Sequence, residues 1–134
     1  AGGGKIICVS SLVGKFGTRL RSVYSASKHA LHGYFDSLRS EVYDKNIQIT
    51  IICPGFIKTN VSVNALTGDG TAEGTMDDAQ ENGMSAEECA NKIMLAIDEG
   101  KEEVNIGGKE VKGVLFKRLF PLRFSKYLRK AKVN

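Results

Sequence analysis

The chain has 134 residues, of which 42% are hydrophobic and 25% are charged, and it contains only two prolines. This composition is that of an ordinary globular domain, and it excludes collagen-like and disordered classes; no run of about 18 apolar residues suggests a transmembrane helix. All 15 acidic residues lie at or before Glu110, whereas seven of the 19 basic residues follow Gly113. A nucleic-acid-binding domain would spread its basic residues over the body, so we expect no nucleic-acid partner.

The first two thirds of the chain predict alternating strands and helices. Residues 5–11 (KIICVSS) form a nearly continuous apolar run, which is typical of a strand buried on both faces. Apolar side chains recur at helical spacing over residues 22–44, and residues 47–53 (IQITIIC) form a second β-branched run that Pro54-Gly55 ends. A helix between two such strands predicts a right-handed βαβ unit with parallel strands.

The next segment, 66–84, differs in character because it combines closely spaced glycines and acidic residues with little periodicity. Such a stretch is usually a lid, a binding loop or a disordered segment. Ser85 and Glu88 have the spacing of a capping box, and they open a helix that ends at Gly100. Residues 103–106 are then a third strand, so the sequence predicts an α/β fold, the edge of a doubly wound parallel sheet.

We divide the chain into a body, residues 1–113, and a basic amphipathic tail, residues 114–134. The tail mixes large apolar side chains with basic ones. This pattern is compatible with peripheral contact to an anionic membrane surface. A solvated helix that docks on the body, or on a partner subunit, would show the same pattern.

The cysteines and histidines are expected to be structural. Cys8, Cys53 and Cys89 are an odd number at wide spacing, which favours small buried side chains in a reducing compartment over disulfides. His29 and His32 have no acidic or cysteine partner at the sequence spacing of metal ligands. The sequence therefore predicts no metal site.

Three other residues carry a pattern that indicates chemistry. Tyr24 and Lys28 are four residues apart in the predicted helix, so their side chains share one face. A free tyrosine has a pKa near 10, and an ammonium within about 6 Å favours the phenolate form that proton transfer needs. Ser11 follows the first strand, and the carboxyl ends of parallel strands face the ligand crevice.

Three segments in order resemble the short-chain dehydrogenase/reductase family. GKIICVSSLVG looks like the family's fifth strand with its catalytic serine, YSASKHAL like its active-site helix, and CPGFIKT like the Pro-Gly segment after its sixth strand. The loop after Ser11 and the tail look most like members designated dehydrogenase/reductase family member 7, or related bacterial enzymes. The resemblance implies a partial Rossmann-type sheet that contains the last three strands. It also implies that the chain, which begins at Ala1 within a few residues of its first strand, is a piece of a longer protein.

The resemblance also implies how the catalytic work is divided. Tyr24 would be the general acid-base, Lys28 would assist it and bind the nicotinamide ribose, and Ser11 would orient and polarise the substrate carbonyl. The cofactor would be NADP or NAD, with NADP slightly favoured. The cofactor-binding residues that the resemblance implies are Tyr24, Lys28, Pro54, Gly55, Ile57 and Thr59.

The family's glycine-rich phosphate loop and the residues that select between NAD and NADP have no counterpart in this sequence. Gly2-Gly3-Gly4 cannot serve instead, since a dinucleotide fingerprint follows a strand and opens a helix. The resemblance implies that the intact parent interconverts a carbonyl and an alcohol and forms homo-oligomers. The apolar residues beside the site and in the tail favour a small, lipophilic substrate. The parent would be cytoplasmic or membrane-associated, at the endoplasmic reticulum if a eukaryotic member 7-like protein. The alternative is a non-catalytic fragment, an interaction or membrane-surface module.

Overall fold

The fold is built on a parallel sheet of three strands. The computed structural model describes residues 2–61, 63–64, 70–71, 74 and 78–131. The sheet contains β1 (Gly4–Val9), β2 (Ile47–Pro54) and β5 (Glu103–Ile106), in the order β1-β2-β5. Both pairings are parallel, with Ile6 opposite Ile49 and Ile52 opposite Val104. The strand predicted over residues 103–106 is confirmed.

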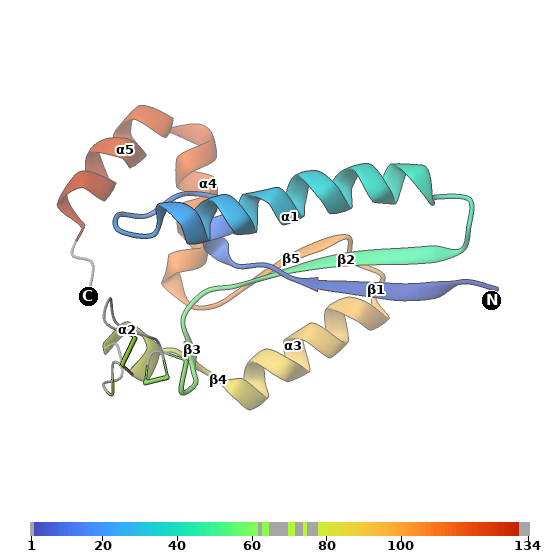
Figure 1. Ribbon diagram of the computed structural model, residues 1–134, viewed down its shortest axis with the longest axis horizontal. Coiled ribbons are helices and arrows are strands. Elements are labelled where there is room, and N and C mark those ends of the chain that lie inside the picture. Colours follow the sequence, from blue (N-terminus) through green and yellow to red (C-terminus); the bar gives the residue numbers. More distant parts are fainter. Residues whose placement is uncertain (1, 62, 65–69, 72–73, 75–77, 132–134) are drawn as a thin grey trace.

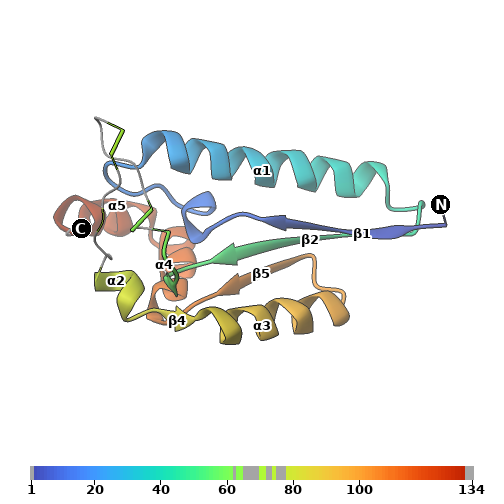
Figure 2. The same cartoon turned by 60° about the horizontal axis from the view of Figure 1, so that its bottom comes forward.

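Two helices cover the two faces of this sheet, as Figures 1 and 2 show. Helix α1 (Ser22–Glu41) connects β1 to β2, and helix α3 (Ala86–Asp98) precedes β5 on the opposite face. The predicted unit of two parallel strands joined by a helix is thereby confirmed. The predicted cap of α3 is also present, since the Ser85 hydroxyl accepts a hydrogen bond from the Glu88 N–H at 3.1 Å.

The shorter elements gather at the carboxyl ends of the three strands (Figure 1). This is the end of a parallel sheet at which ligands bind. A second, two-stranded sheet is formed there by β3 and β4. The elements at this end are η1 (Leu12–Gly14), β3 (Ile57–Lys58), α2 (Asp78–Glu81), β4 (Met84–Ser85), η2 (Lys109–Val111), α4 (Lys112–Leu119) and α5 (Pro121–Lys130).

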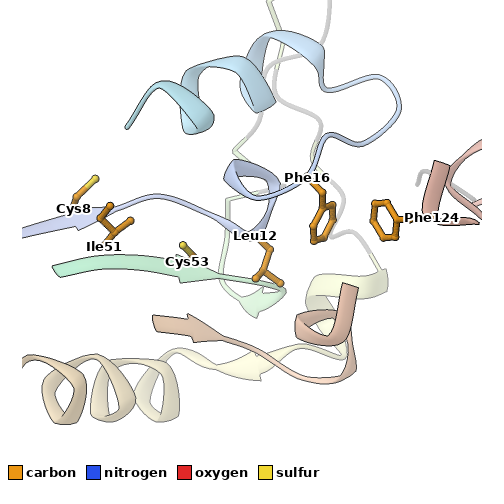
Figure 3. Close-up of a cluster of buried hydrophobic side chains, with 6 residues drawn as sticks. All are labelled: Cys8, Leu12, Phe16, Ile51, Cys53 and Phe124. Atoms are coloured by element: carbon orange, nitrogen blue, oxygen red, sulfur yellow. The ribbon is translucent and has the colours of Figure 1, made fainter. Parts of the chain in front are cut away.

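Strand β2 forms the centre of the core because its side chains point alternately to the two faces. Ile51 and Cys53 belong to the cluster on one face, with Leu12, Phe16 and Phe124 (Figure 3). Ile52 packs on the other face, with Cys89 and Ile106. Burying an isoleucine fully stabilises a fold by about 1.5–3 kcal/mol. Ile51 and Ile52 have no exposed surface, so β2 contributes strongly to stability.

The tail docks on the body through an aromatic cluster. The ring of Phe124 in α5 lies 5.2 Å from that of Phe16 and 5.5 Å from that of Phe116, measured between centroids, and both pairs meet edge to face. Phe124 is only 4% exposed. Helix α5 thus docks on the body, as one of the two interpretations of the tail's pattern predicts. None of the described helices has the length and apolar character needed to cross a bilayer.

Two details differ from the sequence-based expectation. Strand β1 is not buried on both faces: it is an edge strand of the described sheet, and Val9 is 56% exposed. Helix α1 ends at Glu41 rather than at residue 44. In the turn that follows, Asn46 adopts a left-handed conformation with φ of 54°, and its carbonyl accepts a hydrogen bond from the Gly4 N–H. Nine of the 19 residues of the predicted lid loop, residues 66–84, lie outside the described residues, and the described part of it contains α2 and the first residue of β4.

Candidate active site

Ser11 lies just beyond β1, where the chain enters η1. Its hydroxyl accepts a hydrogen bond from the Val13 N–H at 3.3 Å and donates one to the Pro54 carbonyl at 3.4 Å. Both distances exceed those of strong hydrogen bonds. The hydroxyl is therefore positioned by two weak contacts, and it can exchange the Pro54 carbonyl for another acceptor at small cost.

Tyr24 and Lys28 occupy the first two turns of α1, one turn apart as their spacing predicts. The Lys28 Nζ lies 5.6 Å from the centroid of the Tyr24 ring. The same ammonium donates a hydrogen bond to the Val9 carbonyl at 3.2 Å, which holds it against the end of β1. Tyr24 is 44% exposed, so its phenol is accessible to a ligand. The geometry thus places a phenol beside a cation at the carboxyl edge of the sheet.

The Pro54-Gly55 turn is held by a residue that the sequence analysis missed. Glu110 Oε1 accepts hydrogen bonds from the Phe56 N–H at 3.1 Å and from the Gly108 N–H at 3.0 Å. A Cβ atom on Gly55 would lie 2.3 Å from the same oxygen, so a larger residue there would displace the Glu110 side chain. The signal in the sequence was weak, because Glu110 is 54 residues from Phe56 and belongs to no recognised motif.

The remaining two predicted cofactor residues lie in and beside the small second sheet. Ile57 is in β3 and pairs with Met84 of β4. Thr59 follows β3 and is half-buried. Among the predicted site residues, the Ser11 hydroxyl contacts the Pro54 carbonyl, and the Lys28 ammonium contacts the Tyr24 ring. The Ile57 side chain instead packs on the face of the main sheet that α3 covers.

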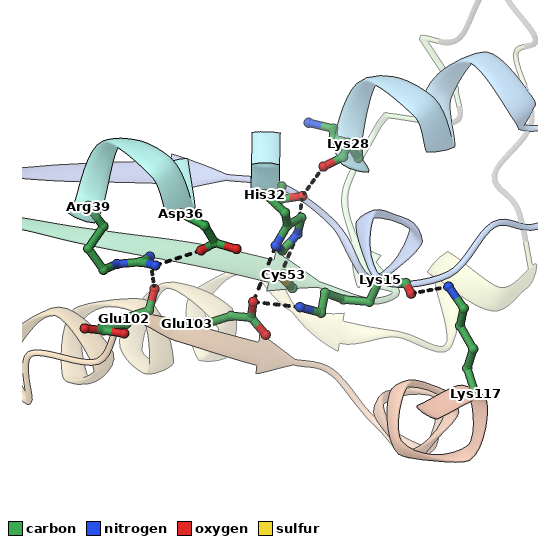
Figure 4. Close-up of polar contacts among 10 residues, drawn as sticks. Lys15, Lys28, His32, Asp36, Arg39, Cys53, Glu102, Glu103 and Lys117 are labelled. Atoms are coloured by element: carbon green, nitrogen blue, oxygen red, sulfur yellow. Dashed lines mark hydrogen bonds and ion pairs between the residues drawn. The ribbon is translucent and has the colours of Figure 1, made fainter. Parts of the chain in front are cut away.

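A buried polar network surrounds His32, which lies one helical turn after Lys28 on α1 (Figure 4). The His32 ring is 8% exposed, and its Nε2 lies 3.1 Å from the Ser10 hydroxyl and 3.6 Å from the Cys53 Sγ. On the other side of the ring, Nδ1 lies 3.4 Å from Glu103 Oε2. The Lys15 ammonium also contacts Glu103 Oε2, at 2.8 Å. Folding therefore gives His32 the acidic and cysteine partners that its sequence neighbourhood lacks.

The protonation states of this network suit a structural role. The Cys53 Sγ is nearest to Nε2 and the Glu103 Oε2 is nearest to Nδ1, and one ligand atom from each of the three residues lies within 4.8 Å of the others. Burial raises the pKa of the Cys53 thiol to about 12, which disfavours the thiolate that binds metals. Burial and then the Lys15 charge lower the pKa of His32, which favours the neutral ring. We interpret the network as a structural connection between α1, β2 and β5.

Other contacts fix the loop that carries Ser11 (Figure 4). Lys15 reaches β5 through Glu103, and the Lys117 ammonium of α4 donates a hydrogen bond to the Lys15 carbonyl at 2.9 Å. Gly14 is required within this loop, since a Cβ atom there would lie 2.6 Å from the Ser10 Oγ and 2.9 Å from the His32 Nε2. The loop after β1 is thus held by β5, by α1 and by the tail.

Comparison with known proteins identifies the family of this chain. The family model for short chain dehydrogenases matches residues 1–69, which include Ser11, Tyr24, Lys28 and the Pro54-Gly55 turn. This chain belongs to the short-chain dehydrogenase family. The resemblance predicted from the three motifs is therefore confirmed, as is the α/β fold with a parallel sheet.

Curated relatives support the same family and the subgroup. The chain is 48% identical, over 118 residues, to "Dehydrogenase/reductase SDR family protein 7-like" of Dictyostelium discoideum, an alignment that covers 88% of this chain and 36% of the relative. It is 43% identical, over 105 residues, to "Dehydrogenase/reductase SDR family member 7B" of Xenopus laevis, which covers 78% of this chain and 32% of the relative. This member of the short-chain dehydrogenase family thus spans about a third of the length of these relatives.

Solved structures show the same fold at low sequence identity. A short chain dehydrogenase of Burkholderia cenocepacia in complex with NADP superposes with a TM-score of 0.70 at 21% identity, covering 98% of this chain and 48% of that chain. A short chain dehydrogenase/reductase of Burkholderia phymatum in complex with NAD has a TM-score of 0.70 at 16% identity, covering 97% and 50%. Nearly the whole chain therefore has the architecture of about half of a short-chain dehydrogenase.

Proposed function

We propose that this chain is the catalytic part of a nicotinamide-dependent oxidoreductase that interconverts a carbonyl and an alcohol. The observation that carries the proposal is the position of the Tyr24 phenol, exposed at the carboxyl edge of the sheet with the Lys28 ammonium 5.6 Å from its ring. Two solved structures with the same fold contain NADP and NAD. They support a nicotinamide dinucleotide as cofactor and leave both forms open.

Tyr24 is the proposed general acid-base. In the direction of reduction its hydroxyl gives a proton to the carbonyl oxygen, and in the direction of oxidation it accepts the proton of the alcohol. The cation of Lys28 stabilises the phenolate that remains after the proton has left. Such a positioned acid-base contributes about 10²–10⁴-fold to a rate.

Ser11 is the proposed group that binds the substrate oxygen. Its hydroxyl donates to the Pro54 carbonyl at 3.4 Å, a long contact that a substrate carbonyl can replace. A donor aimed at an oxygen that gains negative charge stabilises the transition state more than the ground state. Ser11 would therefore orient the carbonyl while Tyr24 transfers the proton.

The residues of this chain fit one part of a nicotinamide dinucleotide. Lys28 and Tyr24 present a cation and a phenol that suit ribose hydroxyls, and Thr59 adds a hydroxyl beyond β3. The bound dinucleotide supplies the hydride. No glycine-rich turn follows β1, because residues 12–14 form η1 and Gly14 packs against His32. We propose that the segment which holds the pyrophosphate pairs with the free edge of β1, where Val9 is exposed.

The test uses a fusion protein in which the N-terminal region of the Dictyostelium relative, up to the point where the similarity begins, precedes this chain. We expect the fusion to oxidise NADPH or NADH in the presence of small lipophilic ketones and aldehydes. Tyr24→Phe should lower turnover by about 10²–10⁴-fold, and it should change the dissociation constant of the dinucleotide far less, because Lys28 still binds the ribose.

The matched control is Tyr34→Phe, which removes the hydroxyl of a more exposed tyrosine from the same helix. Tyr34 is 63% exposed, and its ring packs against Phe35 whether or not the hydroxyl is present. Tyr34→Phe should keep full turnover. Equal turnover of both variants would remove Tyr24 from the mechanism, whereas a fusion that binds dinucleotide and reduces no carbonyl would favour a non-catalytic interaction module.

A further inference from the structure

A pocket of about 540 Å³ lies between the loop that precedes α1 and the two helices of the tail. This volume is in the range of small-molecule sites. Its apolar lining includes Phe16, Phe124 and Leu128. The first two rings meet edge to face in the core, as Figure 3 shows, so this wall is rigid. Phe16 and Phe124 are 8% and 4% exposed, so an apolar group of a ligand would contact their accessible edges and the Leu128 side chain.

The same pocket is lined by three cations: Arg19, Lys117 and Arg129. The Lys117 ammonium is fixed by its hydrogen bond to the Lys15 carbonyl at 2.9 Å. Within the described part of the chain, neither Arg19 nor Arg129 forms an ion pair with a carboxylate. No acidic residue lines the pocket, and none follows Glu110 in the sequence. The charges of the pocket therefore have no partner of opposite sign in the described residues.

The pocket adjoins the first turn of α1. Gly17 lines it, and a Cβ atom on Gly17 would lie 4.0 Å from the hydroxyl oxygen of Ser25, the residue after Tyr24. Thr18 also lines the pocket, and its buried hydroxyl has no hydrogen-bond partner among the described residues.

We propose that this pocket is a binding site for a single-chain anionic amphiphile, whose phosphate or carboxylate head contacts Arg19, Lys117 and Arg129 and whose chain packs on Phe16, Phe124 and Leu128. Guanidinium groups bind such heads in a bidentate manner, so two arginines give the site its preference for anions. This binding does not depend on the proposed reductase activity, and its test measures affinity alone.

The experiment titrates the 134-residue chain with decyl phosphate below its critical micelle concentration and follows binding by calorimetry. Decyl maltoside provides the same chain with a neutral head, and inorganic phosphate provides the charge without the chain. We expect saturable binding of decyl phosphate, at least tenfold weaker binding of decyl maltoside, and no measurable binding of inorganic phosphate. Decanoate replaces decyl phosphate in a second series, which distinguishes the two kinds of head.

The double variant Arg19→Gln/Arg129→Gln should weaken the binding of decyl phosphate at least tenfold. The matched control is Arg123→Gln, which removes an arginine of α5 that lies over the Phe120 ring and does not line the pocket. Because Ser125 lines the pocket and is exposed, Ser125→Trp should fill it without disturbing the core. Circular dichroism confirms that each variant is folded.

Three results would overturn the proposal. One is equal affinity for decyl phosphate and decyl maltoside. Another is equal weakening by the arginine double variant and by Arg123→Gln. The third is binding to phosphatidylglycerol vesicles with none to monomeric decyl phosphate, which would assign the basic residues of the tail to a membrane surface instead.

Discussion

Successive turns of α1 differ in exposure and in role. The first turns present Tyr24 and Lys28, which are held by few contacts and remain accessible. The next turn carries His32, which is buried among groups from β2 and β5. Further along, Arg39 binds Asp36 at 2.7 Å and the Glu102 carbonyl at 3.1 Å. One helix thus combines an exposed reactive end with a buried anchoring section.

The difference shows how an exposed site can be precise. A side chain that must meet a ligand cannot itself be buried, so its position has to be fixed by the backbone that carries it. The contacts of His32 and Arg39 hold α1 against the sheet, and those of Lys15 hold the loop with Ser11. Neighbouring residues of the same element therefore have different roles: some stabilise the fold and others take part in the proposed reaction. Substitutions should change either the free energy of unfolding or the turnover, but not both.

The largest effect is expected in the core beneath the anchoring section. Ile51→Ala removes a side chain with no exposed surface and should lower the free energy of unfolding by about 2–5 kcal/mol. Ile6→Ala on the edge strand β1, where the side chain is 36% exposed, should cost less than half as much. Urea denaturation measures both. Equal losses would mean that β1 is as well packed as β2.

The next effect concerns the reactive end. Lys28→Met should lower the turnover of the fusion protein by about 10²-fold, because the phenolate loses its neighbouring cation. Its free energy of unfolding should change by less than about 0.5 kcal/mol. Lys45→Met, in the turn after α1, serves as the control and should change neither quantity. A large loss of stability for Lys28→Met would show that this end of α1 is also structural.

A smaller effect is expected for the residue that holds the Pro54-Gly55 turn. Glu110→Ala removes the acceptor of the Phe56 and Gly108 N–H groups, so the turn should become mobile. We expect the KM for the dinucleotide to rise several-fold while kcat changes little. Glu102→Ala is the control, since it removes an exposed carboxylate that lies away from the turn. A fall in kcat without a change in KM would contradict a positioning role.

The smallest effect is a pH dependence of stability. Burial lowers the pKa of His32 from its ordinary value of 6.5, so the unfolded chain binds a proton more readily than the folded one. The stabilising effect of the neutral ring is complete above pH 6.5 and is lost as the pH falls below it, by at most about 1.4 kcal/mol per pH unit. His32→Gln should remove this slope, and His29→Gln should retain it. Denaturation series at several pH values measure the slope; an unchanged slope in His32→Gln would assign it to another group.

Much of the fold could be predicted because its signals are local. The β-branched run of β2, the Ser85 cap and the spacing of Tyr24 and Lys28 are all contained in short segments whose conformation follows from their own residues. The extent of burial was less predictable. An apolar run has the same pattern in an edge strand as in a central one, so β1 was expected to be buried on both faces, whereas Val9 is largely exposed.

The sequence by itself determined the parallel α/β unit, the family and the three residues of the proposed reaction, because each rests on a periodicity or a motif within one segment. Only the tertiary structure decided the partners of His32, the position of Glu110 against the Pro54-Gly55 turn, and the meeting of Arg19 with Lys117 and Arg129 around one pocket. These groups come from elements that are roughly 20 to 110 residues apart in the sequence. The packing of helices on the sheet brings them together, and no pattern within a single segment predicts such long-range contacts.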